Sequence, residues 1–313
     1  MAPILLQVSH LHKSYGDRRA VDDVSFNVHA GQTVGLIGPN GAGKSSTVGM
    51  ICGLLRADSG AITLGGAAIT TGLCDAKRQI GFVPQDLALY DDLAARDNLL
   101  LFAALYGIKG GEAKRRADAV LELVNLQDRA GDRPATFSGG MKRRLNIAAA
   151  LMHDPALLIL DEPTVGVDPQ SRNAIFDTLE QLKGMGRSLI YTSHYMEEVE
   201  RLADHIVIID HGKVLADESP AALHQRLPAQ AALQVELAQA VPQPWLAAIR
   251  TLTGVTSAGA QDAVLDVLLA DGADALGVMA YLNAQGAHAL HFATARTKLE
   301  DIFLNLTGRS LRD

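Results

Sequence analysis

The chain has 313 residues and a formal net charge of −7 at pH 7, a length that suits about two domains. Hydrophobic residues make up 48% of it and aromatic residues only 4%, so we expect a mainly aliphatic core. The acidic balance argues against a protein that holds nucleic acid through its overall field, and we expect no nucleic-acid partner. One short basic segment, Lys142–Arg144, is a candidate for a local basic patch.

Strand-like and helix-like runs alternate from residue 1 to about 218, which predicts an α/β domain with a parallel sheet. The strongest strand candidates are the runs 33–37, 80–83, 157–161, 188–192 and 205–209. Between about 86 and 153 this alternation stops. Three predicted helices, 94–106, 113–125 and 139–152, follow one another there without a strand. We therefore expect a helical subdomain inserted into the core.

A second domain is predicted over residues 219–313. Its runs read in order as a strand at 233–237, a helix at 244–252, strands near 255–258 and 263–269, a helix at 273–285 and a strand at 288–293. This βαββαβ order is typical of a small ferredoxin-like α+β domain. A final amphipathic helix is predicted from Lys298 to Leu306.

Residues 38–45 match the pattern G-x-x-x-x-G-K-[ST], in which backbone N–H groups surround a phosphate. Lys44 supplies a charge for the β- and γ-phosphates, and the Ser45 hydroxyl can ligate Mg²⁺. An apolar run precedes this phosphate loop and a predicted helix follows, so the helix N-terminus faces the phosphates. We predict that the segment binds a nucleoside triphosphate through Gly38, Pro39, Asn40, Gly41, Ala42, Gly43, Lys44, Ser45 and Ser46.

The apolar run that starts at residue 157 ends in two acids, Asp161 and Glu162. A run without alternation suits a buried parallel strand, and ligands of such sheets lie beyond the carboxyl ends of the strands. Asp161 is therefore a candidate Mg²⁺ ligand. Glu162 would lie near the γ-phosphate, where a carboxylate can orient and deprotonate the attacking water.

Two further polar residues follow predicted strands. Gln85 comes after 80–83 and can ligate Mg²⁺ or the attacking water, and His194 comes after 188–192 and can donate a hydrogen bond to a γ-phosphate oxygen. Tyr15, placed before a strand at 24–28, suits either stacking on an adenine ring or an ordinary half-buried strand position. Asp168 precedes a helix with Pro169 in its first turn.

Ser138, Gly139 and Gly140 open the helix predicted at 139–152. A serine N-cap followed by two glycines leaves backbone N–H groups bare, which makes an anion site at the start of a helix. Taken alone, the segment fits equally well an ordinary capped helix after a flexible turn.

In combination, these motifs resemble the nucleotide-binding subunits of ABC transporters over about residues 4–218, and the Ser-Gly-Gly segment is the most diagnostic part. The matching residues occur in the same order: Tyr15, 38–46, Gln85, 138–141, Asp161, Glu162, Asp168 and His194. The resemblance implies a P-loop, ABC-type fold and a Mg²⁺-dependent ATPase. It also implies a head-to-tail dimer, in which Ser138 and Gly140 of one subunit close over ATP on the other and Asp168 signals across the interface.

Segments 138–144, 192–198 and 299–309 are similar to those of the antibiotic- and multidrug-efflux ATPases of type-2 ABC exporters, which energise a separate membrane polypeptide. Two departures, Asp97 in place of the commoner Glu and Val-Gly-Val-Asp at 165–168, remove no functional group. We therefore predict an ATPase that acts as a homodimer, or with a paired ABC subunit, and drives efflux of a drug-like or lipid-like substrate through a separate permease.

Apolar runs in the chain are too short to cross a bilayer, so we expect a cytoplasmic protein that is peripheral on the membrane through its partner. Cys52 and Cys74 lack metal-ligand spacing and are expected to be free thiols. Two alternatives stay open at this point: a soluble ABC ATPase that acts as a mechanical switch on DNA or ribosomes, and a transporter subunit that serves import.

Overall fold

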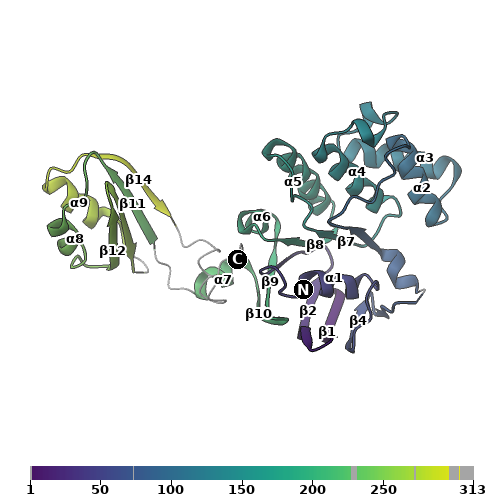
Figure 1. Cartoon of the computed structure of the whole chain (residues 1–313), viewed down its shortest axis with the longest axis horizontal. Coiled ribbons are helices and arrows are strands. Elements are labelled where there is room, and N and C mark those ends of the chain that lie inside the picture. Colours follow the sequence, from purple (N-terminus) through teal and green to yellow (C-terminus); the bar gives the residue numbers. More distant parts are fainter. Residues whose placement is uncertain (1, 73, 227–230, 271–272, 296–302, 304–313) are drawn as a thin grey trace. The chain divides into compact units, whose positions relative to one another are not determined.

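The structure, a computed structural model, describes residues 2–72, 74–226, 231–270, 273–295 and 303. The chain divides into two compact units, an N-terminal unit of residues 1–219 and a C-terminal unit of residues 220–309. Figure 1 follows the chain through both units.

In the described part of the N-terminal unit, the main sheet has six strands in the order β10-β9-β3-β8-β7-β6. All are parallel except β10, which pairs antiparallel with β9 at one edge. The residues of β3, β7 and β8 are all buried, as predicted for inner parallel strands. The bounds are β3 (Thr33–Ile37), β6 (Ile80–Val83), β7 (Leu157–Asp161), β8 (Ser188–Ser193), β9 (His205–Asp210) and β10 (Lys213–Glu218).

A second, antiparallel sheet in this unit was not predicted. Among the described residues it has the order β2-β1-β4-β5, with β1 (Ile4–Tyr15), β2 (Arg18–His29), β4 (Ser59–Leu64) and β5 (Ala67–Ala68). The alternation of buried residues along β1 breaks after Val8 because a bulge follows. His10 and Asp23 have positive φ values of 50° and 65° at this bulge, and His10 Nδ1 lies 2.7 Å from Asp23 Oδ1. The prediction of a parallel core throughout residues 1–218 is therefore wrong for this segment.

Helix α1 (Lys44–Ile51) packs against strands of both sheets, β1 and β2 on one side and β7 on the other. Its apolar residues Val48, Met50 and Ile51 are buried in a core that includes residues of both sheets. The apolar residues therefore lie on more than one side of the second half of the helix, whereas its first turn carries Lys44, Ser45 and Ser46.

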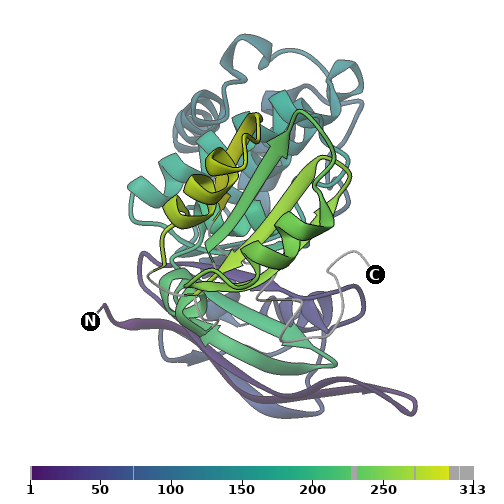
Figure 2. The same ribbon diagram turned by 90° about the vertical axis from the view of Figure 1, so that its left-hand side faces the viewer.

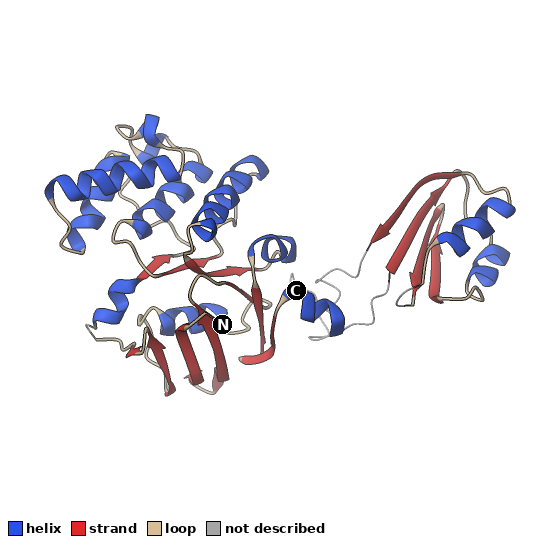
Figure 3. Cartoon of the chain, turned by 180° about the vertical axis from the view of Figure 1, so that it is seen from behind, coloured by secondary structure: helices blue, strands red, loops and turns tan. Residues whose placement is uncertain are grey.

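Three helices form the inserted subdomain: α2 (Ala95–Leu105), α3 (Gly110–Leu123) and α4 (Gly139–Leu151). They pack on one another around a core of their own, and they lie on the opposite side of the main sheet from the antiparallel sheet (Figures 1 and 3). The other helical segments in the described part of the N-terminal unit are η1 (Asp75–Gln79), η2 (Gln127–Arg129), η3 (Pro134–Thr136), α5 (Pro169–Gly184) and α6 (Met196–Leu202). Helix α7 (Pro220–Arg226) begins the C-terminal unit.

The described residues of the C-terminal unit form a four-stranded antiparallel sheet in the order β14-β11-β13-β12. Helices α8 and α9 lie on one face of it (Figures 2 and 3), over a core from both layers. The order of elements confirms the ferredoxin-like βαββαβ arrangement. The bounds are β11 (Ala231–Leu237), α8 (Gln243–Ile249), β12 (Val255–Gln261), β13 (Val264–Leu269), α9 (Leu276–Ala284) and β14 (Ala289–Ala295).

The helix predicted from Lys298 to Leu306 lies outside the described residues, except for Phe303, which is helical and buried. In the described part of the chain, no helix has both the length and the hydropathy needed to span a bilayer.

Candidate nucleotide site

The phosphate loop connects β3 to α1, and the backbone of neighbouring segments fixes its shape. A side chain at Gly38 would collide with the carbonyl oxygen of Ile209, at the end of β9. Gly43 has a φ of 108°, and a Cβ there would collide with the carbonyl oxygen of Ala20 in β2. The loop therefore needs glycine at both positions for close packing, and at Gly43 also for its backbone conformation.

Helix α1 begins at Lys44, so the backbone N–H groups of Lys44, Ser45 and Ser46 have no partner within the helix. The first helical hydrogen bond runs from Thr47 N to Gly43 O over 2.9 Å. Ser45 and Asn40 are exposed, so backbone donors and a hydroxyl are accessible at this turn. This arrangement suits a phosphate group.

The Lys44 side chain is 6% exposed and folds into the loop. Its Nζ donates to Gly38 O over 2.7 Å and to Pro39 O over 3.1 Å. Burial lowers the pKa of Lys44, and the carboxylates of Glu162 and Asp161 oppose that shift. The charge of Lys44 thus lies at the loop and within electrostatic reach of the two acids.

Tyr15 ends strand β1 and precedes the strand predicted at 24–28, which is longer than predicted because β2 already starts at Arg18. It lies opposite Arg18 across the hairpin, is 50% exposed, and has Lys13 Nζ 5.6 Å from its ring centre. Arg18 was not predicted, and its Nη2 donates to Gly41 O over 3.1 Å. This bond joins the hairpin that carries Tyr15 to the phosphate loop.

Three predicted residues meet beyond the ends of neighbouring strands β6, β7 and β8. Gln85 Nε2 lies 3.3 Å from Glu162 Oε2, and His194 Nδ1 lies 3.5 Å from Glu162 Oε1. The Glu162 side chain is only 14% exposed. The structure therefore brings together the amide, carboxylate and imidazole that the sequence placed at three strand ends.

Thr192, which sequence reasoning missed, holds the two acids in place. Its Oγ1 donates to Asp161 Oδ1 over 2.6 Å and accepts a hydrogen bond from Glu162 N over 2.9 Å. Glu162 has a φ of 47°, a left-handed conformation that costs a non-glycine residue about 1–3 kcal/mol. The hydrogen bond from Glu162 N to Thr192 Oγ1 helps to hold the strained backbone of Glu162.

The oxygen donors of the three candidate ligands are of a type that fits a magnesium ion. Ser45 offers a hydroxyl, Gln85 an amide oxygen and Asp161 its second carboxylate oxygen, all of the hard type that Mg²⁺ prefers. Among the described residues, no three or more His, Cys, Asp or Glu side chains form a metal cage. A site with one carboxylate is the kind in which substrate phosphates and water complete the coordination.

Ser138 and Asp168 cap helices in the structure. Ser138 Oγ accepts from Met141 N over 3.2 Å at the start of α4, and Asp168 Oδ1 accepts from Ser171 N over 2.9 Å at the start of α5. The bond from Ser171 lowers the pKa of Asp168. A Cβ at Gly140 would collide with Ser171, so the two caps lie together at the contact of α4 with α5.

This region belongs to the helical subdomain, and Ser138 and Gly139 are exposed there. No hydrogen bond of the described residues joins Ser138 to the phosphate loop, so the structure does not assemble all predicted residues into one cluster. Lys142–Arg144 is not a basic patch, since each side chain binds within the chain: to Asp91, Pro84 O and Val124 O, respectively.

A phosphate loop after an inner strand of a parallel sheet, with paired acids at the end of β7, defines a P-loop protein that binds a nucleoside triphosphate. Residues 21–165 match the family model described as ABC transporter. Together with the full-length similarities below, this places the chain in the ABC transporter family, as an ATP-binding protein and ATPase.

Relatives match almost the whole chain. The linearmycin resistance ATP-binding protein LnrL of Bacillus subtilis (strain 168) is 46% identical over 312 residues, covering 99% of this chain and 100% of the relative. The Nod factor export ATP-binding protein I of Sinorhizobium fredii is 36% identical over 312 residues, covering 99% of this chain and 88% of the relative.

Solved structures match the ATPase core. The ATP-binding subunit of an ABC transporter has a TM-score of 0.64 at 34% identity and covers 71% of this chain and 92% of its own. A dimeric ATP-binding cassette in a post-hydrolysis state, bound to ADP and Pi, has a TM-score of 0.62 at 26% identity, covering 69% and 98%. These similarities confirm the predicted fold class.

Proposed function

We propose that the chain is the ATPase subunit of an exporter, that it hydrolyses ATP with Mg²⁺ at the cluster of Glu162, Gln85 and His194, and that it drives a drug-like or lipid-like substrate through a separate membrane subunit. The observation that carries the proposal is the convergence of these three side chains beyond β6, β7 and β8, next to Lys44. Two relatives named for linearmycin resistance and Nod factor export support the direction of transport.

Each residue of the cluster has a chemical role in this proposal. Glu162 is the general base that orients and deprotonates the attacking water, and Gln85, which donates to it, holds its carboxylate. His194 turns Nδ1 towards Glu162, so Nε2, on the far side of the ring, is available to a γ-phosphate oxygen. Lys44 and the N-terminus of α1 stabilise the charge of the phosphates. Bound Mg²⁺, held by Ser45, Gln85 and Asp161, would neutralise phosphate charge.

Replacing Glu162 by glutamine tests this assignment. Glu162→Gln keeps an oxygen for the bond from Gln85 and removes the base, so we expect turnover to fall by about 10²–10⁴-fold while ATP affinity is retained. The control is Glu197→Gln, an exposed glutamate at the start of α6. Near-normal hydrolysis by Glu162→Gln would refute the role given to Glu162.

We also propose that ATP brings two copies together, with the exposed N-terminus of α4 closing over the phosphate loop of the partner. The dimeric cassette among the solved structures supports this arrangement. An ideal Cβ at Gly139 meets no atom within 4 Å in the described chain, so a large side chain fits the monomer but would block the lid. With ATP, Glu162→Gln should double its molar mass by light scattering, and the added change Gly139→Trp should keep it monomeric. Dimers in both variants would refute the lid.

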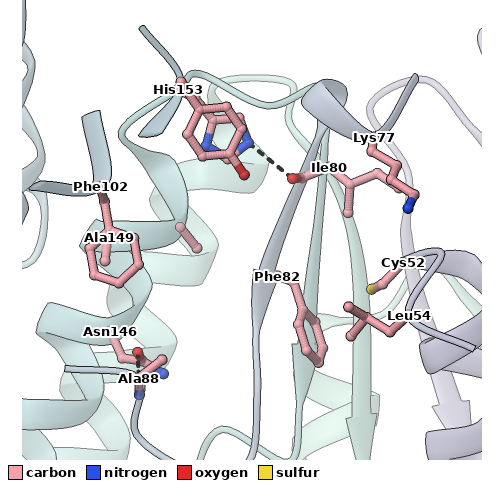
Figure 4. A pocket seen from close by; sticks show the side chains of 12 residues that line it. Cys52, Leu54, Lys77, Ile80, Phe82, Ala88, Phe102, Asn146, Ala149 and His153 are labelled. Carbon is pink, nitrogen blue, oxygen red and sulfur yellow. Dashed lines mark hydrogen bonds between the residues drawn. The ribbon is translucent and has the colours of Figure 1, made fainter. Parts of the chain in front are cut away.

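A groove between the core and the helical subdomain supports a membrane partner (Figure 4). It encloses about 280 Å³. Phe82 and Leu54 line it from the core and Phe102 from α2, so it offers an apolar surface, and Phe82 precedes Gln85 by three residues in the sequence. We propose that an apolar segment of the membrane subunit binds there, which would connect that subunit to the site through residues 82–85.

Two buried polar atoms in the groove have no hydrogen-bond partner among the described residues: Asn146 Nδ2 and His153 Nδ1. His153 stacks on Tyr106, and its Nε2 lies 2.9 Å from Ile80 O, which can only accept. Burial lowers the pKa of His153, so the ring is neutral with its proton on Nε2, and Nδ1 is an acceptor.

The test for the partner compares two positions on α2. Phe102→Asp puts a charge into the groove, whereas Leu105→Asp changes a residue that is 72% exposed. We expect only Phe102→Asp to abolish sedimentation with native membranes, and both purified variants to hydrolyse ATP normally. Absence of the wild-type protein from those membranes would favour the soluble mechanical switch instead.

A further inference from the structure

Glu198 is a buried carboxylate that the proposed chemistry does not use. It lies in the first turn of α6 and is 5% exposed. Burying a carboxylate costs several kcal/mol unless polar partners replace water. Its partners therefore show what it is there to hold.

Three hydroxyl groups converge on a single oxygen of this carboxylate. Glu198 Oε2 lies 2.7 Å from Tyr191 OH, 2.7 Å from Ser193 Oγ and 2.9 Å from Thr164 Oγ1. All three contacts lie within the ordinary range of O–H···O hydrogen bonds. An amide oxygen carries no charge and is a weaker acceptor than a carboxylate oxygen, so glutamine could not replace the group fully.

The other oxygen faces a cation. Glu198 Oε1 has Arg172 Nε at 3.6 Å, beyond hydrogen-bond distance, and neither atom has a hydrogen bond among the described residues. The Arg172 guanidinium also lies 5.0 Å from the centre of the Tyr195 ring. Arg172 is in the first turn of α5, and its N–H bonds to Asp168 O over 2.9 Å.

Each partner is close in sequence to a residue of the proposed site. Thr164 lies two residues after Glu162, Ser193 immediately precedes His194, and Arg172 is in the helix that Asp168 caps. The Ser193 hydroxyl also accepts from Tyr195 N over 2.9 Å, so it fixes the turn around His194. One carboxylate thus connects these segments just beyond the last ladder pair of β7 with β8, Asp161 with Thr192.

We propose that Glu198 is a positioning residue for ATP hydrolysis: it holds the segments of Glu162, His194 and Asp168 in register, without touching the nucleotide. This rests on the roles proposed above for Glu162 and His194. The phosphate loop lies outside the network, so Glu198 sets the rate of the chemical step and not the binding of ATP. An error of about 1 Å in such groups costs up to about 100-fold in rate.

The experiment measures kcat and KM for ATP together with the unfolding temperature of the full chain. For Glu198→Gln we expect kcat to fall about 10- to 100-fold, with KM within about twofold of the wild type. The matched control is Glu197→Gln, which removes the same charge from an exposed neighbour on the same helix, and it should keep wild-type kcat.

A milder variant covers the case in which Glu198→Gln does not fold. Ser193→Ala removes one of the three donors and should lower kcat by itself, with an unfolding temperature close to that of the wild type. Added to Glu198→Gln, where that variant folds, Ser193→Ala should cause little further loss, because residues that act as a unit are not additive.

Two results would overturn the proposal: wild-type kcat in both Glu198→Gln and Ser193→Ala, or a raised KM with kcat unchanged. Glu162→Gln in the same assay separates this failure from that of the proposed site. If Glu162→Gln is inactive while Glu198→Gln and Ser193→Ala have wild-type kcat, the proposed site is supported and only the positioning role of Glu198 is refuted. If Glu162→Gln is active, the assignment of the site itself is wrong.

Discussion

Replacing Gly38 by alanine tests how the phosphate loop is held in place. A Cβ at this position would lie well inside the 3.0 Å that real Cβ contacts keep, and the atom it meets is the main-chain oxygen of Ile209. A flexible side chain could rotate away, but β9 is paired on both sides within the sheet. The loop must therefore move away from β9.

Relieving this contact requires a shift of about 1 Å, and a displacement of that size at a reacting centre costs about 100-fold, or about 2.7 kcal/mol. We expect kcat/KM for ATP to fall by that amount in Gly38→Ala, measured by phosphate release from the purified protein. The control is Gly184→Ala at the end of α5, where an ideal Cβ meets nothing within 4 Å. Alanine in a helix should leave that variant at least as stable as the wild type.

A rate for Gly38→Ala within about threefold of that of Gly184→Ala would refute the reasoning, because the loop would then tolerate displacement. Circular dichroism distinguishes a displaced loop from an unfolded chain. A folded but slow Gly38→Ala supports the argument, whereas an unfolded one would mean that the contact of Gly38 with Ile209 serves the fold as a whole.

Three further outcomes are expected. A maleimide should label only Cys74 in the folded protein. A backbone hydrogen bond from Thr70 lowers the pKa of Cys74, whereas Cys52 is buried and its pKa is raised to about 12. Mass spectrometry with and without denaturant checks this. Burial lowers the pKa of His153 from 6.5, so the unfolded chain binds this proton more readily and the free energy of unfolding falls as pH drops below about 6.5. Urea unfolding of His153→Phe should show a shallower fall. A chain of residues 1–219 should bind a fluorescent ATP analogue like the full protein, because every proposed ligand precedes residue 195; a folded truncate that does not bind would refute the proposed domain boundary.

The strands of the main sheet could be predicted because each is a short, continuous apolar run. Residues 157–160 show why: with neighbours on both sides and both faces covered, β7 has no polar alternation to confuse with a surface element. The strand-end residues Gln85, Glu162 and His194 followed from the same logic. Since parallel strands end at one edge, side chains just beyond them meet.

The antiparallel sheet could not be predicted in the same way. Bulges shift the register of β1 and β2, so the apolar residues of β1 change from even to odd positions between Val8 and Leu11. Arg18, Thr192 and Glu198 were missed for another reason. Each acts through a contact with a segment distant in sequence, and nothing in the local pattern distinguishes an arginine after a turn or a threonine in a strand.

The left-handed backbone of Glu162 has a consequence for how this protein can change. Glycine or asparagine adopts a φ of 47° at little cost. Substitution by either should therefore make the folded chain more stable by up to about 1–2 kcal/mol while removing the carboxylate. Selection for stability and selection for ATP turnover thus oppose each other at this position.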